Sequence, residues 1–339
     1  MAAITEYIEH LLRRESLSFE KAKQLLDTIF EGQVSETQIA ALLTAMQAKN
    51  VTASELAGFA KSLREHAVKV NVDVDHLVDT CGTGGAAVKT FNISTAAALV
   101  AAGAGVYVAK HGNKGITSGC GSADVLAELG VKIDTSAEIV AECIRQAHIG
   151  FMFAPLFHPA MKFVQPVRKA LGFRTIFNFL GPLANPAGVR NQVLGVADEN
   201  LMQIVADALK LLGVRYAMVV HSKGLDEIST MNITKILELK NGMTITRELD
   251  CSDYDIAPAD LKTIKGGDIK NNAKIVREII EGKDKGPRRD LVTLNAAAAI
   301  IVAGLTDDFE PAIKMARASI DSGKAKKCLD KLIEISNKN

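Results

Sequence analysis

The chain of 339 residues carries 40 basic and 39 acidic side chains, which leaves a formal net charge of +1. This balance argues against a broad binding surface for nucleic-acid backbones, which needs a clustered excess of cations, but it leaves room for one small anion site. The five cysteines form no CxxC pair, so neither a disulfide framework nor a zinc site is indicated.

The N-terminal part of the chain has the apolar spacing of four amphipathic helices. Two of the helix starts, at Ser35 and Thr52, have the residue spacing of a capping box. We expect a small helical domain over residues 1–70, joined by helices near 163–185. An exposed apolar face on such a domain favours a homodimer formed through it.

Beyond residue 70, strands alternate with helices. Apolar strands are predicted at 77–78, 106–109 and 216–220, with helices at 96–103, 122–129, 137–147, 199–212 and 291–303. Two further strands flank Asn241-Gly242, which predicts a hairpin and hence a mixed sheet. Residues 251–288 are polar and are expected at the surface. This order predicts an α/β domain over 71–339 whose ligands bind at the carboxyl ends of a mainly parallel sheet.

No segment of the sequence suggests secretion or a membrane span. The first residues lack a basic stretch followed by an apolar run, so a signal peptide is not evident. The longest apolar stretch, residues 296–304, is too short to cross a bilayer. We therefore expect a cytoplasmic protein that contacts no membrane.

A glycine loop follows the first strand of the α/β domain. Its glycines let main-chain N–H groups approach an anion, and an apolar helix with amide and hydroxyl donors at its start follows shortly afterwards. The loop comprises Gly82, Thr83, Gly84 and Gly85, and the helix start comprises Asn92, Ser94 and Thr95. By itself the loop fits neither the dinucleotide nor the P-loop pattern and is as typical of a tight turn. Together with the helix start, it predicts a site for a phosphorylated small molecule.

Polar and basic residues follow at the next strand end. Lys110 supplies a cation suited to phosphate, and His111 is interpreted either as a base or, more simply, as a pocket wall. Ser122 starts a helix after a second turn rich in hydrogen-bond donors. Arg168 opens a basic helix over 168–178 and suits a carboxylate, although a solvated arginine fits equally well.

Two adjacent carboxylates, Asp226 and Glu227, come just after the strand that ends near His221. A carboxylate pair there suits Mg²⁺, which binds one or two carboxylates together with waters and substrate phosphates. A solvated acidic turn is the alternative. Cys81 lies beside the glycine loop, where it is interpreted as a small loop residue rather than a nucleophile.

In this order, the blocks resemble anthranilate phosphoribosyltransferase over nearly the whole chain. They are GTGG at 82–85, TFNIST at 90–95, KHGN at 110–113, GSADVLAELG at 121–130, RKALGFRTIFNFLGPLANP at 168–186, GLDEIS at 224–229 and LNAAAA at 294–299. The resemblance implies the fold of the nucleoside-phosphorylase-like phosphoribosyltransferases: a small helical domain and a large α/β domain, typically as a homodimer. It also implies a Mg²⁺-dependent step of tryptophan biosynthesis. In that step, ribose 5-phosphate passes from phosphoribosyl pyrophosphate (PRPP) to the amine of anthranilate, and pyrophosphate is released.

The resemblance also implies roles for individual residues. The PRPP-binding set is Gly82, Thr83, Gly84, Gly85, Thr90, Asn92, Ser94, Thr95, Lys110 and Ser122. The anthranilate-binding set is Gly82, His111, Asn113 and Arg168, and the Mg²⁺ set is Ser94, Asp226 and Glu227. In these roles Lys110 stabilises the leaving charge and Arg168 orients the acceptor, while no residue is an obvious general base.

Two residues depart from the family pattern: Ala86 stands where Asp usually follows GTGG, and Lys114 stands where Arg commonly follows KHGN. We expect the loss of the acidic group to affect the metal requirement and the mobility of the glycine loop. The lysine keeps the positive charge but lacks the bidentate fork of arginine. Two other functions stay open at this stage: a pyrimidine nucleoside phosphorylase, which shares the architecture, and a non-catalytic relative that binds nucleic acid.

Overall fold

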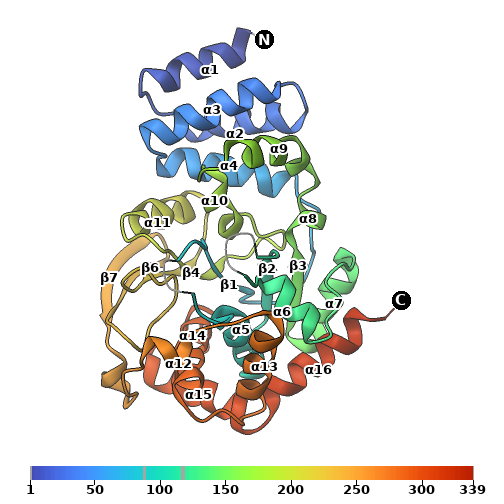
Figure 1. The fold of residues 1–339 in the computed structure, drawn as a ribbon, viewed down its shortest axis with the longest axis vertical. Helices are drawn as coiled ribbons and strands as arrows, with labels where there is room; N and C mark the ends of the chain where they lie inside the picture. Colours follow the sequence, from blue (N-terminus) through green and yellow to red (C-terminus); the bar gives the residue numbers. More distant parts are fainter. Residues whose placement is uncertain (1, 87–88, 116–118, 339) are drawn as a thin grey trace.

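The structure, a computed structural model, describes residues 2–86, 89–115 and 119–338. A helical bundle stands at one end of the molecule and an α/β domain at the other (Figure 1). The bundle helices are α1 (Ala2–Leu12), α2 (Phe19–Phe30), α3 (Glu36–Lys49) and α4 (Ala53–Glu65). Both predicted capping boxes form, at Ser35 and at Thr52. The N-terminal helices are therefore as the sequence indicated.

In the described part of the chain, seven strands form one sheet of order β3-β2-β1-β4-β5-β6-β7. The strands are β1 (Val78–Gly82), β2 (Val108–Gly112), β3 (Ile149–Phe153), β4 (Asn191–Gly195), β5 (Tyr216–His221), β6 (Thr234–Lys240) and β7 (Met243–Leu249). The first five are parallel, and the hairpin of β6 and β7 adds two antiparallel strands. The sheet is thus mixed and mainly parallel. Its strand order reverses at β1, which lies between β2 and β4.

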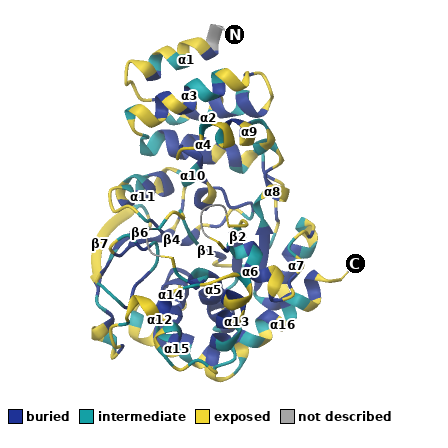
Figure 2. Ribbon diagram, viewed as in Figure 1, coloured by how far each residue is buried: buried dark blue, intermediate teal, exposed yellow. Residues whose placement is uncertain are grey.

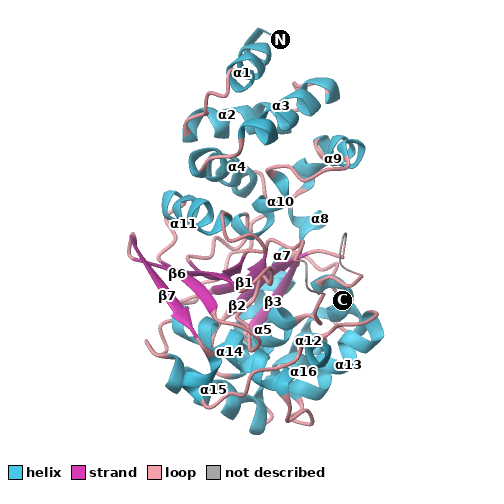
Figure 3. Ribbon diagram, turned by 60° about the vertical axis from the view of Figure 1, so that its left-hand side comes forward, coloured by secondary structure: helices cyan, strands magenta, loops and turns pink. Residues whose placement is uncertain are grey.

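Helices cover both faces of this sheet, while α9 (Gln165–Leu171) lies beside the N-terminal bundle (Figure 3). The other helices are α5 (Ile93–Gly103), α6 (Ser122–Glu128), α7 (Ala137–Ala147), α8 (Ala154–Phe157), α10 (Phe177–Leu180), α11 (Leu201–Leu211), α12 (Leu261–Ile264), α13 (Ile269–Ile280), α14 (Pro287–Val302), α15 (Phe309–Asp321) and α16 (Lys324–Ser336). Short 3₁₀ helices lie at Pro159–Phe163, Gly181–Leu183 and Cys251–Tyr254. Among the described residues we find no helix with the length and hydropathy of a transmembrane span.

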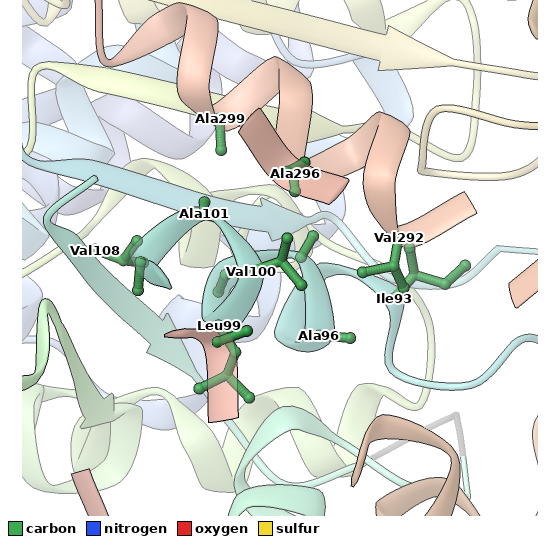
Figure 4. Packing of buried hydrophobic residues seen from close by; sticks show 14 of the residues in the cluster. Ile93, Ala96, Leu99, Val100, Ala101, Val108, Val292, Ala296 and Ala299 are labelled. Atoms are coloured by element: carbon green, nitrogen blue, oxygen red, sulfur yellow. The ribbon is translucent and has the colours of Figure 1, made fainter. Parts of the chain in front are cut away.

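The main core lies between the sheet and helices α5 and α14. Alanine side chains let the two helices approach closely, as Ala101 of α5 points toward Ala299 of α14 in Figure 4. Figure 2 shows this interior as buried and β7 as exposed. A second core joins the bundle, α9, α10 and α11 to the other face of β4 and β5. The close packing fixes the starts of α5 and α14, which both face the strand ends.

Two expectations from the sequence are wrong. Residues 251–288 are not all at the surface, because α13 buries Ile275, Val276, Ile279 and Ile280 in the main core behind a charged outer face. The basic helix predicted over 168–178 ends at Leu171, because Gly172 adopts a left-handed conformation with φ of 67°. The chain then turns and starts α10 at Phe177.

Candidate active site

Most of the polar residues singled out in the sequence lie where the carboxyl ends of β1, β2, β4 and β5 meet, whereas Arg168 lies on α9. These strand ends mark the point at which the strand order reverses, where ligands bind in open α/β sheets. Two strand-end glycines allow the loop after β5 to lie directly on the sheet. A Cβ atom at Gly82 would lie 2.4 Å from Asp226 Oδ2, and one at Gly195 would lie 1.7 Å from the Asp226 carbonyl oxygen.

The glycine loop and the start of α5 both bind the carboxylate pair. The Gly84 N–H donates to Asp226 Oδ2 at 3.1 Å, and the Ser94 N–H donates to Glu227 Oε1 at 3.2 Å. These are a loop N–H and a helix N-terminal N–H, which are the donors that phosphate groups use in proteins. The structure therefore brings together segments that lie more than 130 residues apart in the chain.

Asp226 and Glu227 are half-buried and repel each other. Burial raises the pKa of Asp226, and burial together with the Asp226 charge raises the pKa of Glu227 to about 8. A divalent cation would relieve this repulsion, and the Ser94 hydroxyl is a third hard oxygen nearby. No three His, Cys, Asp or Glu side chains gather within the described ranges. The donor set therefore fits Mg²⁺, which takes its remaining oxygens from ligand and water.

Lys110 lies beneath the carboxylates and is only 2 % exposed. Its Nζ donates to the Thr80 carbonyl at 2.6 Å and to Ser94 Oγ at 3.5 Å. Burial lowers the pKa of Lys110, and the nearby Asp79 is the strongest of the groups that oppose this shift. Lys110 therefore contributes a fixed positive charge from within the sheet rather than an exposed ammonium group.

Asp79 is fully buried at the same level. It accepts hydrogen bonds from Asn185 Nδ2 at 2.8 Å and from the His111 N–H at 3.4 Å. Burial raises the pKa of Asp79 to about 6, against the opposing effect of Lys110. Asn185 also donates to the Ala109 carbonyl at 2.8 Å, so it joins the segment after α10 to β1 and β2.

Asn295 of α14 is a further site residue that the sequence interpretation did not identify. Its Oδ1 accepts from the Ile228 N–H at 3.0 Å, and its Nδ2 donates to the Ile228 carbonyl at 2.8 Å. The residue directly after Glu227 is thus clamped on both sides by a buried side chain. The only signal in the sequence was one amide within the apolar LNAAAA block.

His111 and His158 form a buried ring pair, with centroids 5.0 Å apart. His111 Nδ1 lies 3.1 Å from the Gly181 carbonyl, which ties β2 to the segment after α10. Its Nε2 has no hydrogen-bond partner among the described residues. The His111 side chain is therefore a neutral wall with one free ring nitrogen.

Arg168 is half-buried on α9. Its guanidinium carbon lies 5.6 Å from the centre of the Phe177 ring, and its Nη1 donates to Gln165 Oε1 at 3.3 Å. No carboxylate of the described residues forms an ion pair with it, so its charge is available to an acidic ligand. Asn113 follows the end of β2 and is not in contact with Arg168 in the described part of the chain. Its side-chain oxygen accepts a hydrogen bond from the Lys114 N–H at 2.8 Å.

The remaining predicted residues lie in the loops and helix starts that follow β1 and β2. Buried hydroxyl oxygens of Thr83 and Thr95 have no described partner, and Asn92 is held by Asn272 Nδ2 at 3.2 Å. Gly112 leaves space for Ser122, whose Oγ would lie 2.0 Å from a Cβ atom there. Thr90 pairs with Lys265 in an isolated bridge.

The site gains neither a nucleophile from Cys81 nor an acidic group from Ala86 and Lys114, the two residues that depart from the family pattern. Burial raises the pKa of Cys81, which agrees with a structural thiol. Ala86 is half-buried next to the glycine loop, and Lys114 is exposed, with its Nζ 5.9 Å from the centre of the Phe153 ring.

Comparison with protein families supports both parts of the fold. The model described as "Glycosyl transferase family, a/b domain" matches residues 74–326, and the one described as "Glycosyl transferase family, helical bundle domain" matches residues 5–67. The anthranilate phosphoribosyltransferases of Roseiflexus sp. (strain RS-1) and Methanocorpusculum labreanum are 48% and 49% identical to the chain. Each alignment covers 98% of both chains.

Solved structures show the same similarity. The anthranilate phosphoribosyltransferase of Thermus thermophilus superposes with a TM-score of 0.93 at 38% identity, covering 98% of this chain and 99% of that one. The Saccharomyces cerevisiae enzyme in complex with PRPP and Mg superposes with a TM-score of 0.90 at 29% identity, covering 99% and 98%. The complex of the yeast enzyme with 4-fluoroanthranilate gives 0.89 at 28% identity, with the same coverage.

The buried histidine pair predicts how stability depends on pH. Burial lowers the pKa of His111 to about 4 and that of His158 to about 3, both below the value of 6.5 for a free side chain. Between pH 6.5 and these values only the unfolded chain takes up these two protons, so the histidines lower the free energy of unfolding as pH falls, by up to about 1.4 kcal/mol per pH unit each. The raised pKa values of Asp79 and Glu227 act in the opposite direction, so the histidine contribution is read from a comparison. Urea titrations from pH 7 to 4.5 of the unmodified chain and of the double variant His111→Gln/His158→Gln give this difference. The variant should become more stable relative to the unmodified chain as pH falls, and a constant difference would contradict the assignment.

Proposed function

The chain belongs to the anthranilate phosphoribosyltransferases, and from this premise we propose how its own residues carry out the transfer. The reaction forms a bond between the amine of anthranilate and C1 of the ribose of PRPP, breaks the bond from C1 to pyrophosphate, and releases one proton of the amine to water. It is a step of tryptophan biosynthesis. The observation that carries the proposal is the meeting of the Gly84 and Ser94 N–H groups with Asp226 and Glu227 at the strand ends.

The donor half of the site is the glycine loop, the start of α5 and the end of β2. Its main-chain N–H groups and hydroxyls would hold the phosphates of PRPP, with Lys110 adding positive charge from below. The proposed residues are Gly82, Thr83, Gly84, Gly85, Thr90, Asn92, Ser94, Thr95, Lys110 and Ser122. The partnerless hydroxyls of Thr83 and Thr95 support this assignment, because a bound ligand would satisfy them.

Mg²⁺ would be held by Asp226, Glu227 and Ser94. When bound, it supplies positive charge that stabilises the departing pyrophosphate. The Asn295 clamp on Ile228 would keep the carboxylate pair in place for this role.

The acceptor half is Arg168 with His111, Asn113 and the edge of Gly82. The free guanidinium of Arg168 would bind the carboxylate of anthranilate and orient its amine, and His111 would line the pocket. The amine of anthranilate carries little positive charge at neutral pH, so it is a nucleophile without prior deprotonation. Burial keeps His111 neutral, but its ring forms a wall of the proposed anthranilate pocket. We therefore assign no general base.

The alternative functions, a pyrimidine nucleoside phosphorylase or a non-catalytic nucleic-acid binder, are not favoured by the relatives compared above. We also propose that residues 1–70, with helices near 163–185, act as one helical unit and residues 71–339 as the PRPP-binding domain. The helical unit would form a homodimer, as the family resemblance implies. A cytoplasmic location remains part of the proposal.

The activity is tested by following the fluorescence of anthranilate with the purified chain and PRPP. Consumption should require both PRPP and Mg²⁺, and chelation of the metal should stop it. Pyrimidine nucleosides with inorganic phosphate should give no product. Turnover of a nucleoside, with no consumption of anthranilate, would contradict the proposed function.

The metal assignment is tested with the double variant Asp226→Asn/Glu227→Gln. Each amide keeps an oxygen that accepts from Gly84 or Ser94, so the loop contacts persist while the negative charge is lost. We expect turnover to fall by about 1,000-fold or more, as when charge stabilisation is removed from a transition state. Calorimetric titration with Mn²⁺ in the presence of PRPP should lose its binding signal. A variant that keeps full turnover would disprove the assignment.

The acceptor assignment is tested with Arg168→Ala. A lost charge-assisted hydrogen bond is worth about 1.5–3 kcal/mol, so KM for anthranilate should rise about 10- to 100-fold while KM for PRPP changes little. Lys169→Ala is the matched control, because Lys169 is an exposed cation on the same helix. Equal increases in both KM values would argue against a carboxylate-binding role.

A further inference from the structure

The two peptide units that flank Gly84, at the tip of the glycine loop, are each held by a side chain. Its N–H donates to Asp226 Oδ2 at 3.1 Å, and its carbonyl accepts from Arg174 Nη2 at 3.0 Å. Gly84 and Gly85 both have left-handed conformations, with φ of 69° and 76°. The loop is exposed at Gly84, so these side-chain contacts are what hold its tip.

The Arg174 guanidinium fits closely against the loop. A Cβ atom at Gly85 would lie 2.7 Å from Arg174 Nη2 and 2.8 Å from its Cζ, so the guanidinium covers the space that a larger residue would fill. On its other side, the guanidinium carbon lies 5.6 Å from the centre of the Phe179 ring of α10. The side chain thus lies between an aromatic ring and the glycine loop.

The position of Arg174 follows from the left-handed turn at Gly172. This turn ends α9 and directs the chain toward the strand ends before α10 begins at Phe177. The same segment carries Arg168 on α9, so one stretch of chain contributes to the acceptor half and contacts the donor half of the site.

We propose that Arg174 is a positioning residue that holds the glycine loop in the conformation that binds PRPP. The inference rests on the proposed function, because it concerns the loop that would bind this substrate. Arg174 acts through the Gly84 carbonyl and the surface of Gly85. No described hydrogen bond joins it to Asp226, although its charge acts to lower the pKa of that carboxyl. The Gly84 carbonyl shares its peptide plane with the Gly85 N–H, which is one of the loop donors proposed for the phosphates, so the bond from Arg174 orients that donor.

The test compares Arg174→Ala, Arg174→Gln and the control Lys169→Ala. The glutamine variant keeps an N–H donor for the Gly84 carbonyl, but it loses the charge and the planar fork. Calorimetry gives the Kd for PRPP in the presence of Mg²⁺ and without anthranilate, and steady-state kinetics give kcat and both KM values. Thermal unfolding confirms that each variant is folded, which is expected because the Arg174 side chain is exposed.

We expect Arg174→Ala to raise the Kd and KM for PRPP about tenfold, as the loss of one charge-assisted hydrogen bond at an exposed site suggests. KM for anthranilate and kcat should change less than about threefold, and Arg174→Gln should recover part of the loss. A Kd for PRPP within about twofold of the unmodified chain would overturn the inference, as would an effect on KM for anthranilate alone. If the unmodified chain binds PRPP but does not consume anthranilate, the proposed function fails while the binding comparison still decides the role of Arg174.

Discussion

The site depends on a positive charge buried under the strand ends. Taking an ammonium group out of water is costly unless oxygens and negative charges surround it. Lys110 meets this condition through the Thr80 carbonyl, the Ser94 hydroxyl and the nearby charges of Asp79 and Glu227. These contacts join β2, β1, the start of α5 and the loop after β5 around one ammonium group. Because each partner is needed to offset the same desolvation cost, the elements that form the site are coupled to one another.

The sheet topology, together with small residues (glycine and alanine), places the other site residues around that charge. Reversal of strand order at β1 puts the ends of β1 and β4 side by side, and glycines at both ends let the Asp226 backbone approach them. Alanines then allow α5 and α14 to pack closely (Figure 4), which brings Asn295 to the residue after Glu227. The segment after α9 closes the other side through Gly181, Asn185 and Arg174.

Local signals in the sequence predicted much of this fold, and contacts between distant segments account for the rest. The capping boxes and the turn at Asn241-Gly242 depend on neighbouring residues, so they were predictable. Strand β4 was not predicted, because Asn191 and Gln192 interrupt its apolar pattern although both are buried. In the site, the sequence motifs pointed to the candidate residues but not to the side chains that bind Ile228, Asp79 and Gly84. These side chains are Asn295, Asn185 and Arg174. They have no distinctive spacing in the sequence, and only the tertiary fold gives them a role.

The hydrogen bonds from Gly84 and Ser94 to the carboxylate pair have a consequence for the catalytic cycle. Within the chain, these main-chain donors are satisfied by Asp226 and Glu227. In the proposed function, a phosphate that takes these donors would exchange one acceptor for another, so each hydrogen bond would add less to affinity than its geometry suggests. Departure of pyrophosphate would then leave no donor unpaired, because each has an acidic side chain within reach. Such an exchange would favour release of a highly charged product.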